Sequence, residues 1–212
     1  MKNIIIIFSI LFCLTTYSQT KFFIHHEAET YVSNTKTIAI LPLRVDVRLR
    51  PRQLKKYTAE QIKEINKSES LNVQSAMYSW FLTREQRGEL LVGVQNPSTT
   101  NAILKKNGID IYSTADYTAK ELGELLGVET VITGSLKTSK PMSDAGAVGL
   151  FLLTGGEFAT NTALLNMSFT NTSDNKVVVN YNKKIKRSIG SDTQSVINAL
   201  MRKISRRMPY TK

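Results

Sequence analysis

The chain has 212 residues, of which 42% are hydrophobic and 21% are charged, and it contains a single Cys. These proportions are typical of a globular domain and exclude collagen-like, coiled-coil and fully disordered chains, while one cysteine excludes a disulfide scaffold and a cysteine-rich zinc module. With 28 Lys and Arg against 17 Asp and Glu, the formal net charge is +11, which favours anionic partners but does not determine a fold.

The first 18 residues have the pattern of a bacterial secretory signal peptide. Lys2 supplies an early positive charge, residues 4–14 are almost wholly apolar, and the small residue Ser18 precedes the expected cleavage point. The apolar stretch is shorter than the about 20 residues that a transmembrane helix needs. We therefore expect residues 1–18 to be removed, and the protein to be exported to the periplasm or to the outer membrane.

Cys13 lies inside this segment and suggests a second interpretation, a lipid anchor. A lipid-acceptor cysteine usually follows a small residue, whereas Phe12 precedes Cys13 here and a further apolar residue, Leu14, follows it. The sequence favours Cys13 as an apolar residue of the signal segment, and whether it is lipidated stays open.

The segment that follows the signal, residues 19–36, has no long hydrophobic period, and we interpret it as an N-terminal arm with room for one irregular strand. An α/β domain is expected over residues 37–208. It begins with residues 37–43, a run of β-branched and apolar residues typical of a strand buried on both faces. Pro42 should end this strand because proline cannot donate to a β-ladder. Residues 44–56 are basic and predict a loop.

The middle of the chain alternates between helical and extended patterns. Residues 58–85 have a helical hydrophobic period, which the polar stretch 66–70 interrupts, so a break or a separate short helix stays open. Residues 90–94 predict a second strand. A short helix is expected next, with Ser98 as its N-cap and Gly108 at its end.

The last third of the chain completes the predicted fold. We expect a helix over residues 116–127, a strand over 128–136, and a hairpin of strands 163–169 and 176–185 around a turn-rich loop. Asp192 is expected to cap a final amphipathic helix. This order predicts an α/β fold, a single domain with a mixed β-sheet of about five strands flanked by helices and a C-terminal amphipathic helix.

The sequence contains no complete motif for catalysis or for cofactor binding. Residues 33–36 match Ser-x-x-Lys and residues 173–175 match Ser-Asp-Asn, but the lysine triplet at 137–139 precedes the second motif instead of following it, so we reject this set. Residues 25–27 read His-His-Glu, but a metalloprotease helix requires His-Glu-x-x-His, and Thr30 stands where the second histidine should be. The chain has only 2 His, too few for a histidine-rich metal site. Phosphate loops, nucleophile elbows and dinucleotide fingerprints are absent as well. The sequence therefore assigns no catalytic, cofactor-binding or metal-binding residue.

Two segments are predicted to bind partners. The apolar, glycine-rich stretch within residues 139–160 contributes Val148, Leu150, Phe151 and Leu152. The polar side of the last helix contributes the basic residues Arg202, Lys203, Arg206 and Arg207. An export signal argues against nucleic acid, so the expected partner is an envelope protein, an anionic lipid or an acidic glycan. Core packing of the loop and a solvated face on the helix are the structural alternatives.

Three parts of the chain carry a resemblance to a known family. They are the strand at residues 37–43, the segment ADYTAKELGELLGVETVITGSL at residues 115–136, and the hairpin that follows with its turn at residues 173–176. A helix that ends in Leu-Gly before a strand of this kind resembles the superfamily that contains the periplasmic domain of the curli secretion channel CsgG and the penicillin-binding-protein activator LpoB. The pattern is also similar to the N-terminal domain of TolB. The resemblance covers about residues 37–207.

The resemblance implies a non-enzymatic envelope protein that assembles, activates or exports something. A channel member of the family also needs membrane hairpins, and residues 185–191 are too short for two strands of about ten residues each. We therefore expect an exported factor that binds a protein partner, and a homo-oligomer is one possible state of it. The alternatives are a subunit of an oligomeric outer-membrane secretion channel and an envelope hydrolase.

Overall fold

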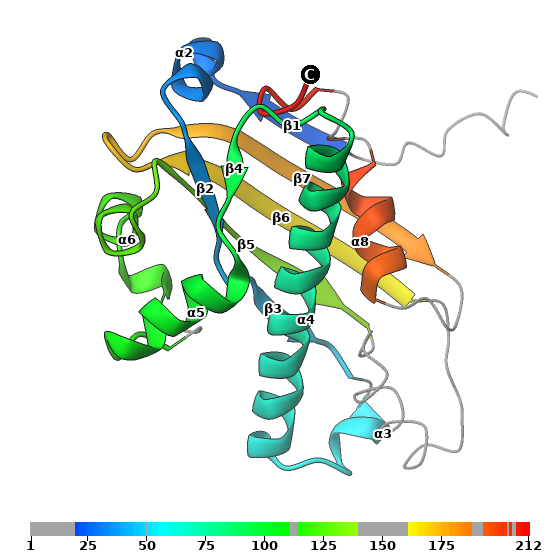
Figure 1. Ribbon diagram of the computed structural model, residues 1–212. Helices are drawn as coiled ribbons and strands as arrows, with labels where there is room; N and C mark the ends of the chain where they lie inside the picture. The colour runs from blue at the N-terminus through cyan, green and yellow to red at the C-terminus, as the bar shows by residue number, and fades with distance from the viewer. Residues whose placement is uncertain are drawn as a thin grey trace, which may run out of the picture.

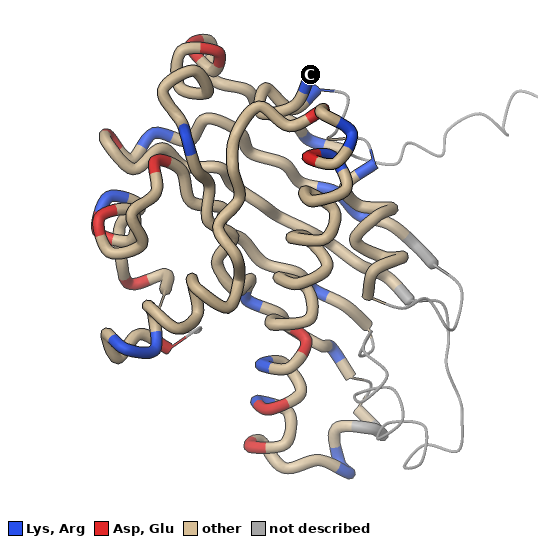
Figure 2. The backbone as a smooth tube through the Cα atoms, viewed as in Figure 1, with Lys and Arg blue, Asp and Glu red and all other residues tan. Residues whose placement is uncertain are grey.

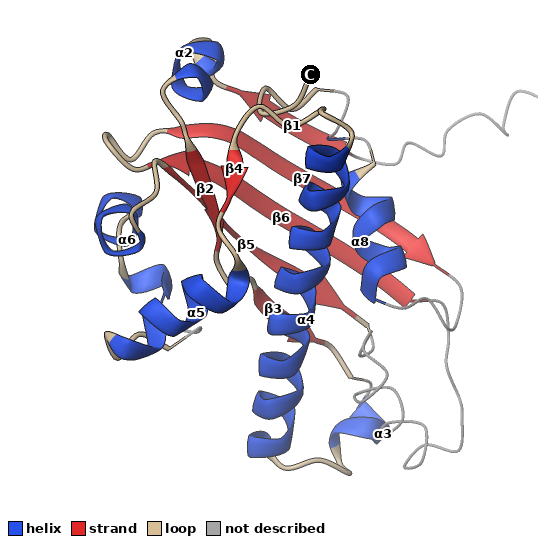
Figure 3. Ribbon diagram, in the orientation of Figure 1, coloured by secondary structure: helices blue, strands red, loops and turns tan. Residues whose placement is uncertain are grey.

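The computed structural model describes residues 20–49, 51–110, 114–139, 161–187, 193–202, 204 and 207–212, without the side chains of residues 52, 53, 161, 186 and 187. This part of the chain forms one α/β domain, in which helices flank an open, mixed sheet of seven strands (Figures 1 and 3). The predicted fold class is confirmed, but the sheet has seven strands where the sequence predicted about five. The predicted signal segment, residues 1–18, lies outside the described residues.

The strands in chain order are β1 (Thr20–Ile24), β2 (Thr37–Ile40), β3 (Arg44–Val47), β4 (Gly93–Val94), β5 (Thr130–Thr138), β6 (Asn161–Asn171) and β7 (Val177–Arg187). Across the sheet their order is β1-β7-β6-β5-β2-β4, and β3 also pairs with β5. The pairs β1–β7, β7–β6 and β6–β5 are antiparallel, whereas the pairs β5–β2, β5–β3 and β2–β4 are parallel.

The helices in chain order are α2 (Ala28–Ser33), α3 (Pro51–Leu54), α4 (Ala59–Gln86), α5 (Pro97–Lys106), a 3-10 turn (Thr114–Asp116), α6 (Ala119–Leu126) and α8 (Thr193–Met201). The long helix α4 crosses one face of the sheet, with α8 beside it, while α5 and α6 lie near the β4 edge (Figure 1). No helix in the described part of the chain combines the length and the apolar character that crossing a bilayer requires.

Alternation along β2 divides the core into two clusters. Ile38 and Ile40 face α4 and α8 and belong to the larger cluster, while Ala39 and Leu41 face α5 and α6 and belong to the smaller one. Successive side chains of a strand point to opposite faces of a sheet, so the continuous apolar run in this strand requires a helix layer on each side. The prediction of a strand buried on both faces is confirmed here.

The chain breaks its strand at Pro42 and resumes it as β3 along the same neighbour. Ile38 to Ile40 pair with residues 130–132 of β5, and Arg44 to Val47 pair with residues 135–138 further along it. Proline cannot donate to the ladder, which explains the interruption. The prediction of a loop over residues 44–56 is therefore wrong, because this segment contains β3 and α3.

Helix α4 is unbroken, although its sequence left a break at residues 66–70 open. Its polar side chains bind the interrupted strand instead of ending the helix. The Ser70 hydroxyl donates to the Leu43 carbonyl at 2.6 Å, and the Gln74 amide donates to the Ile40 carbonyl at 2.7 Å. Both side chains are buried. They give hydrogen-bond partners to the Leu43 and Ile40 carbonyl groups, on either side of Pro42.

We expect Ser70→Ala to lower the free energy of unfolding by about 1–3 kcal/mol, because the buried Leu43 carbonyl would lose its partner. Ser75→Ala is the matched control, because Ser75 is an exposed residue of the same helix. Alanine favours helix there, so this control should keep or slightly raise stability. Urea unfolding followed by circular dichroism measures both variants. Equal stability of the two variants would show that the Ser70 contact contributes nothing.

The N-terminal arm is part of the sheet. Residues 20–24 form the predicted strand, and this strand is regular and pairs antiparallel with β7. The helix α2 that follows it was not predicted. Tyr31 in α2 donates its hydroxyl hydrogen to the Asp174 carboxylate at 2.8 Å, which joins this segment to the β6–β7 turn.

The segment that carries the family resemblance forms a helix, a tight turn and a strand. Thr118 and Glu121 make a reciprocal capping box at the start of α6, and Gly127 ends the helix with φ +67°. Gly123 lies against the β6–β7 hairpin, since a Cβ atom there would stand 2.3 Å from the Thr172 side chain. The two glycines therefore have separate roles, one in the turn and one in the contact of α6 with the hairpin.

Candidate functional site

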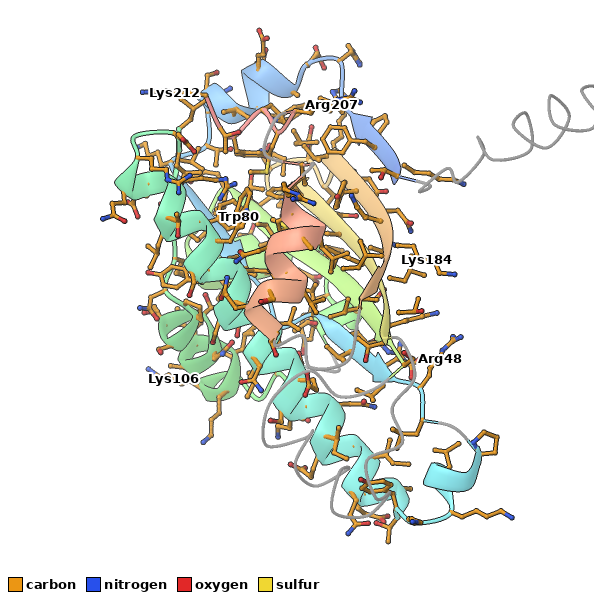
Figure 4. All side chains as sticks on the ribbon, turned by 90° about the vertical axis from the view of Figure 1, so that its right-hand side faces the viewer. Arg48, Trp80, Lys106, Lys184, Arg207 and Lys212 are labelled. Atoms are coloured by element: carbon orange, nitrogen blue, oxygen red, sulfur yellow. The ribbon has the colours of Figure 1, made fainter. Side chains whose placement is uncertain are left out.

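The predicted partner-binding residues lie partly outside the described structure. Val148, Leu150, Phe151 and Leu152 lie outside the described residues, as do Lys203 and Arg206. Arg202 and Arg207 are described and exposed, and both lie at the C-terminal end of α8 or just after it. The side chain of Arg207 is labelled near that end in Figure 4.

The two predicted binding segments are attached to different parts of the fold. Residues 139–160 connect the end of β5 to the start of β6, where Thr138 pairs with Ala163. Beside this point Lys137 pairs with Leu164, and Leu164 pairs with Lys184 of β7. Both lysines are exposed, and Lys184 points away from α4 and α8 (Figure 4). Both lysines therefore lie near the strand ends that residues 139–160 connect, on the sheet face opposite α4 and α8.

That face of β5, β6 and β7 carries polar side chains. Asn166 and Ser168 alternate with the buried residues of β6, and the Asn180 amide donates to the Ser168 hydroxyl at 2.7 Å. Most hydrophobic residues of the same strands point the other way, into the larger core cluster, and Leu164 is an exception. A sheet with one face packed and one face solvated gives this alternation.

A groove of about 570 Å³ lies where α8 packs beside α4. Its lining residues are Ser79, Trp80, Thr83, Arg84, Arg87, Gln194, Asn198 and Arg202. We call it the α4–α8 groove. Figure 4 labels Trp80 on α4 close to α8. Arg202, which the sequence analysis identified on the last helix, therefore shares a cavity with Arg84 of α4 and with Arg87, which caps the end of α4. The sequence analysis did not identify these two arginines.

Arg84 is held in a fixed position in the α4–α8 groove. Its guanidinium carbon lies 3.2 Å from the centre of the Trp80 ring, and its Nη1 donates to the Trp80 carbonyl at 3.1 Å. Burial lowers the pKa of Arg84, the charge of Arg87 lowers it further, and the charge of Glu89 partly offsets both effects. Its Nε is buried and has no hydrogen-bond partner among the described residues.

A second cavity, of about 530 Å³, lies where β2 ends. Leu41, Pro42 and Leu122 contribute apolar surface to it, and the start of α6 contributes polar groups. Those groups already have partners, because Asn175 Oδ1 accepts from the Lys120 amide and Thr118 Oγ1 accepts from the Glu121 amide. The helix start therefore has little capacity left to bind an anion here.

Residues 25–27 gather metal-binding atoms at the surface. One ligand atom from each of His25, His26 and Glu27 lies within 4.8 Å of the others. The imidazole rings stack at 4.4 Å, and Nδ1 of His25 accepts a hydrogen bond from the Glu27 amide. One ring nitrogen is thus already engaged in a local turn. That these residues bind no metal stays a prediction.

Acidic residues lie mostly on the helices and turns (Figure 2). Several of them have structural partners: Glu121 caps α6, Glu129 accepts from the Thr37 amide at 2.8 Å, and Asp174 binds Tyr31 and Lys176. The hydrogen bond to Asp174 is the main reason why the pKa of Tyr31 is raised. These side chains hold the fold together rather than converging on one cavity.

No protein-family model matches the chain, and no curated protein matches its sequence. Several solved structures are similar to it. Lipoprotein GNA1162 from Neisseria meningitidis aligns with 82% of this chain and 97% of its own at 10% identity and a TM-score of 0.46. The PelC dodecamer from Paraburkholderia phytofirmans aligns over 88% of this chain and 94% of the PelC chain, at 10% identity and a TM-score of 0.39. The LpoB C-terminal domain from Salmonella enterica aligns over 76% of this chain and 96% of the LpoB domain, at 6% identity and a TM-score of 0.34.

Proposed function

We propose that this chain is an exported cell-envelope protein that binds an acidic protein partner and performs no chemistry of its own. The observation that carries the proposal is the contrast between its charged groups. The acids described above are engaged in caps, turns and strand contacts, while Lys137 and Lys184 are exposed on the sheet face opposite α4 and α8. An active site normally requires titratable groups that converge.

The proposed docking surface consists of Lys137, Lys184 and the apolar loop residues Val148, Leu150, Phe151 and Leu152. Its charge favours an acidic partner. The neighbouring acid in register with Lys137 is Asp46, and this carboxylate already pairs with Arg48 at 3.2 Å. Neither lysine makes an ion pair with another described residue. Such lysines would attract an acidic surface, against which the apolar loop residues could then bury their side chains. The basic residues Arg202, Lys203, Arg206 and Arg207 form a second proposed contact.

The test is photo-crosslinking in the envelope of the producing cell, with the crosslinked protein identified by mass spectrometry. We expect one acidic protein to be captured by the wild-type chain. Lys137→Glu combined with Lys184→Glu should reduce that capture at least tenfold, and so should deletion of residues 145–153. Lys105→Glu with Lys106→Glu is the matched control, because these exposed lysines lie on α5.

Three results would contradict the proposal. The first is capture that the Lys137 and Lys184 changes leave intact in a folded protein. The second is an intact product that keeps residues 1–18 inside the cytoplasm. The third is a mature protein that forms conducting rings in planar bilayers, which would establish the secretion-channel alternative instead.

A further inference from the structure

The α4–α8 groove contains an arginine, Arg84, whose guanidinium group is already held in one orientation. Arg84 is fixed between its hydrogen bond to the Trp80 carbonyl and its stacking on the Trp80 ring, with the guanidinium carbon 3.2 Å from the ring centre. A long arginine side chain normally loses rotamer freedom when it binds a ligand. Here the protein itself has already restricted that freedom, so binding would cost less.

The described wall of the α4–α8 groove has an excess of positively charged residues. Arg84, Arg87 and Arg202 all line the groove, and none of the described lining residues is acidic. Within the described part of the chain, neither Arg84 nor Arg87 makes an ion pair, although Glu89 lies near enough to influence Arg84. The buried Nε of Arg84 also has no hydrogen-bond acceptor among the described residues. A buried donor of this kind normally has a partner.

We propose that the α4–α8 groove binds the phosphate group of a polyol phosphate ester, such as a glycerol phosphate. Guanidinium groups match phosphate oxygens in bidentate pairs, and a phosphate offers more oxygens to three arginines than a carboxylate does. The groove shares Arg202 with the second proposed protein contact. It shares no residue with the docking surface formed by Lys137, Lys184 and the apolar loop residues, so the two proposals can be tested separately.

The remaining lining residues suit the hydroxyl groups of such an ester. The Ser79 hydroxyl donates to the Ser75 carbonyl, and the Thr83 hydroxyl donates to the Ser79 carbonyl. Their oxygens are therefore left to accept hydrogen bonds from a ligand. Asn198 and Gln194 add amide groups from α8. A cavity of about 570 Å³ has room for more than an inorganic ion.

The ester could be a free metabolite or the headgroup of a lipid, and the experiment separates these sources. Isothermal titration at constant ionic strength would use glycerol 3-phosphate, inorganic phosphate and citrate with the exported chain. Co-sedimentation would compare vesicles of phosphatidylglycerol with vesicles of phosphatidylcholine. Binding of glycerol 3-phosphate without vesicle association identifies a soluble ester, and selective association with phosphatidylglycerol identifies a lipid headgroup. Either result supports the proposal.

The variants link binding to the groove. Arg87→Gln combined with Arg202→Gln should weaken binding at least tenfold, and both residues are exposed, so the fold should persist. Arg84→Lys keeps the charge but loses the planar fork, and it should also weaken binding. Arg48→Gln is the matched control, an exposed arginine outside the groove. Lys137→Glu with Lys184→Glu should leave phosphate binding unchanged, which distinguishes this site from the docking surface.

The proposal is overturned if the wild-type chain binds neither glycerol 3-phosphate nor phosphatidylglycerol vesicles. It is also overturned if citrate binds as tightly as glycerol 3-phosphate, or if the folded Arg87 and Arg202 double variant binds like the wild type.

Discussion

Replacing Phe169 with alanine should lower the free energy of unfolding by about 3–5 kcal/mol, the range for removal of a buried aromatic ring. Phe169 is fully buried in β6. Its ring stacks on Tyr210 with centroids 5.3 Å apart and meets Phe81 of α4 edge-on at 6.4 Å. The substitution would leave a cavity where the sheet, α4 and the C-terminal segment meet, and closely packed surroundings can close such a cavity only partly.

Val177→Ala is the control for Phe169→Ala, because Val177 is 37% exposed in the same hairpin. It should change stability by about 0.5 kcal/mol or less, as is usual for surface positions. Chemical unfolding monitored by circular dichroism gives both values. If Phe169→Ala costs no more than Val177→Ala, the aromatic cluster does not stabilise the fold as described.

Gly134→Ala should destabilise the protein by about 1–3 kcal/mol, the usual cost of adding a methyl group to a closely packed site. Gly134 lies in the middle of β5. A Cβ atom there would stand 2.2 Å from the Asn166 carbonyl oxygen and 3.0 Å from the Met167 Cα. These contacts are backbone atoms of the neighbouring strand, so relief requires β5 and β6 to move apart rather than a side chain to rotate.

Gly93→Ala tests the origin of the stability loss expected for Gly134→Ala. That loss could come from the clash with the β6 backbone, or from replacing any glycine of a strand. Gly93 lies in β4, and a Cβ atom there would meet nothing closer than 3.4 Å. We expect Gly93→Ala to be neutral or slightly stabilising, because alanine restricts the unfolded chain more than glycine does. Thermal unfolding of the two variants should therefore separate them. Equal melting temperatures would exclude the steric explanation for Gly134.

The elements that the sequence predicted well are those in which local pattern and tertiary packing agree. Residues 37–43 are apolar at successive positions, and the structure gives them a helix layer on each side. The segment at residues 115–136 contains both its capping box and its terminating glycine. The hairpin also follows from its alternation and its turn. In each case one short stretch of sequence contains the deciding signal.

The missed elements depend on partners that are distant in sequence. β3 is only four residues long, and its strand character comes from pairing with β5. Residues 44–47 pair with residues 135–138, which are far away in the sequence. The polar stretch 66–70 in α4 could not be distinguished from a helix break, because its partners are backbone groups of a distant segment. Asn66 accepts from the Val47 amide, and Ser70 donates to the Leu43 carbonyl.

The α4–α8 groove could be predicted only in part. The spacing of Trp80 and Arg84 places them on one face of a helix, and this i, i+4 pair was the available local signal. Arg202 was identified from the basic face of the last helix. That these residues meet depends on α8 packing beside α4, and no pattern within either helix specifies that arrangement.

Trp80 is the only tryptophan of the chain. Its indole lies at the wall of the α4–α8 groove, is 4% exposed and carries the Arg84 guanidinium on one face. Tryptophan fluorescence, excited at a wavelength that the eight tyrosines hardly absorb, therefore originates from one defined place. A change in emission reports on the environment of that single ring, so the native chain contains its own optical sensor and needs no attached dye.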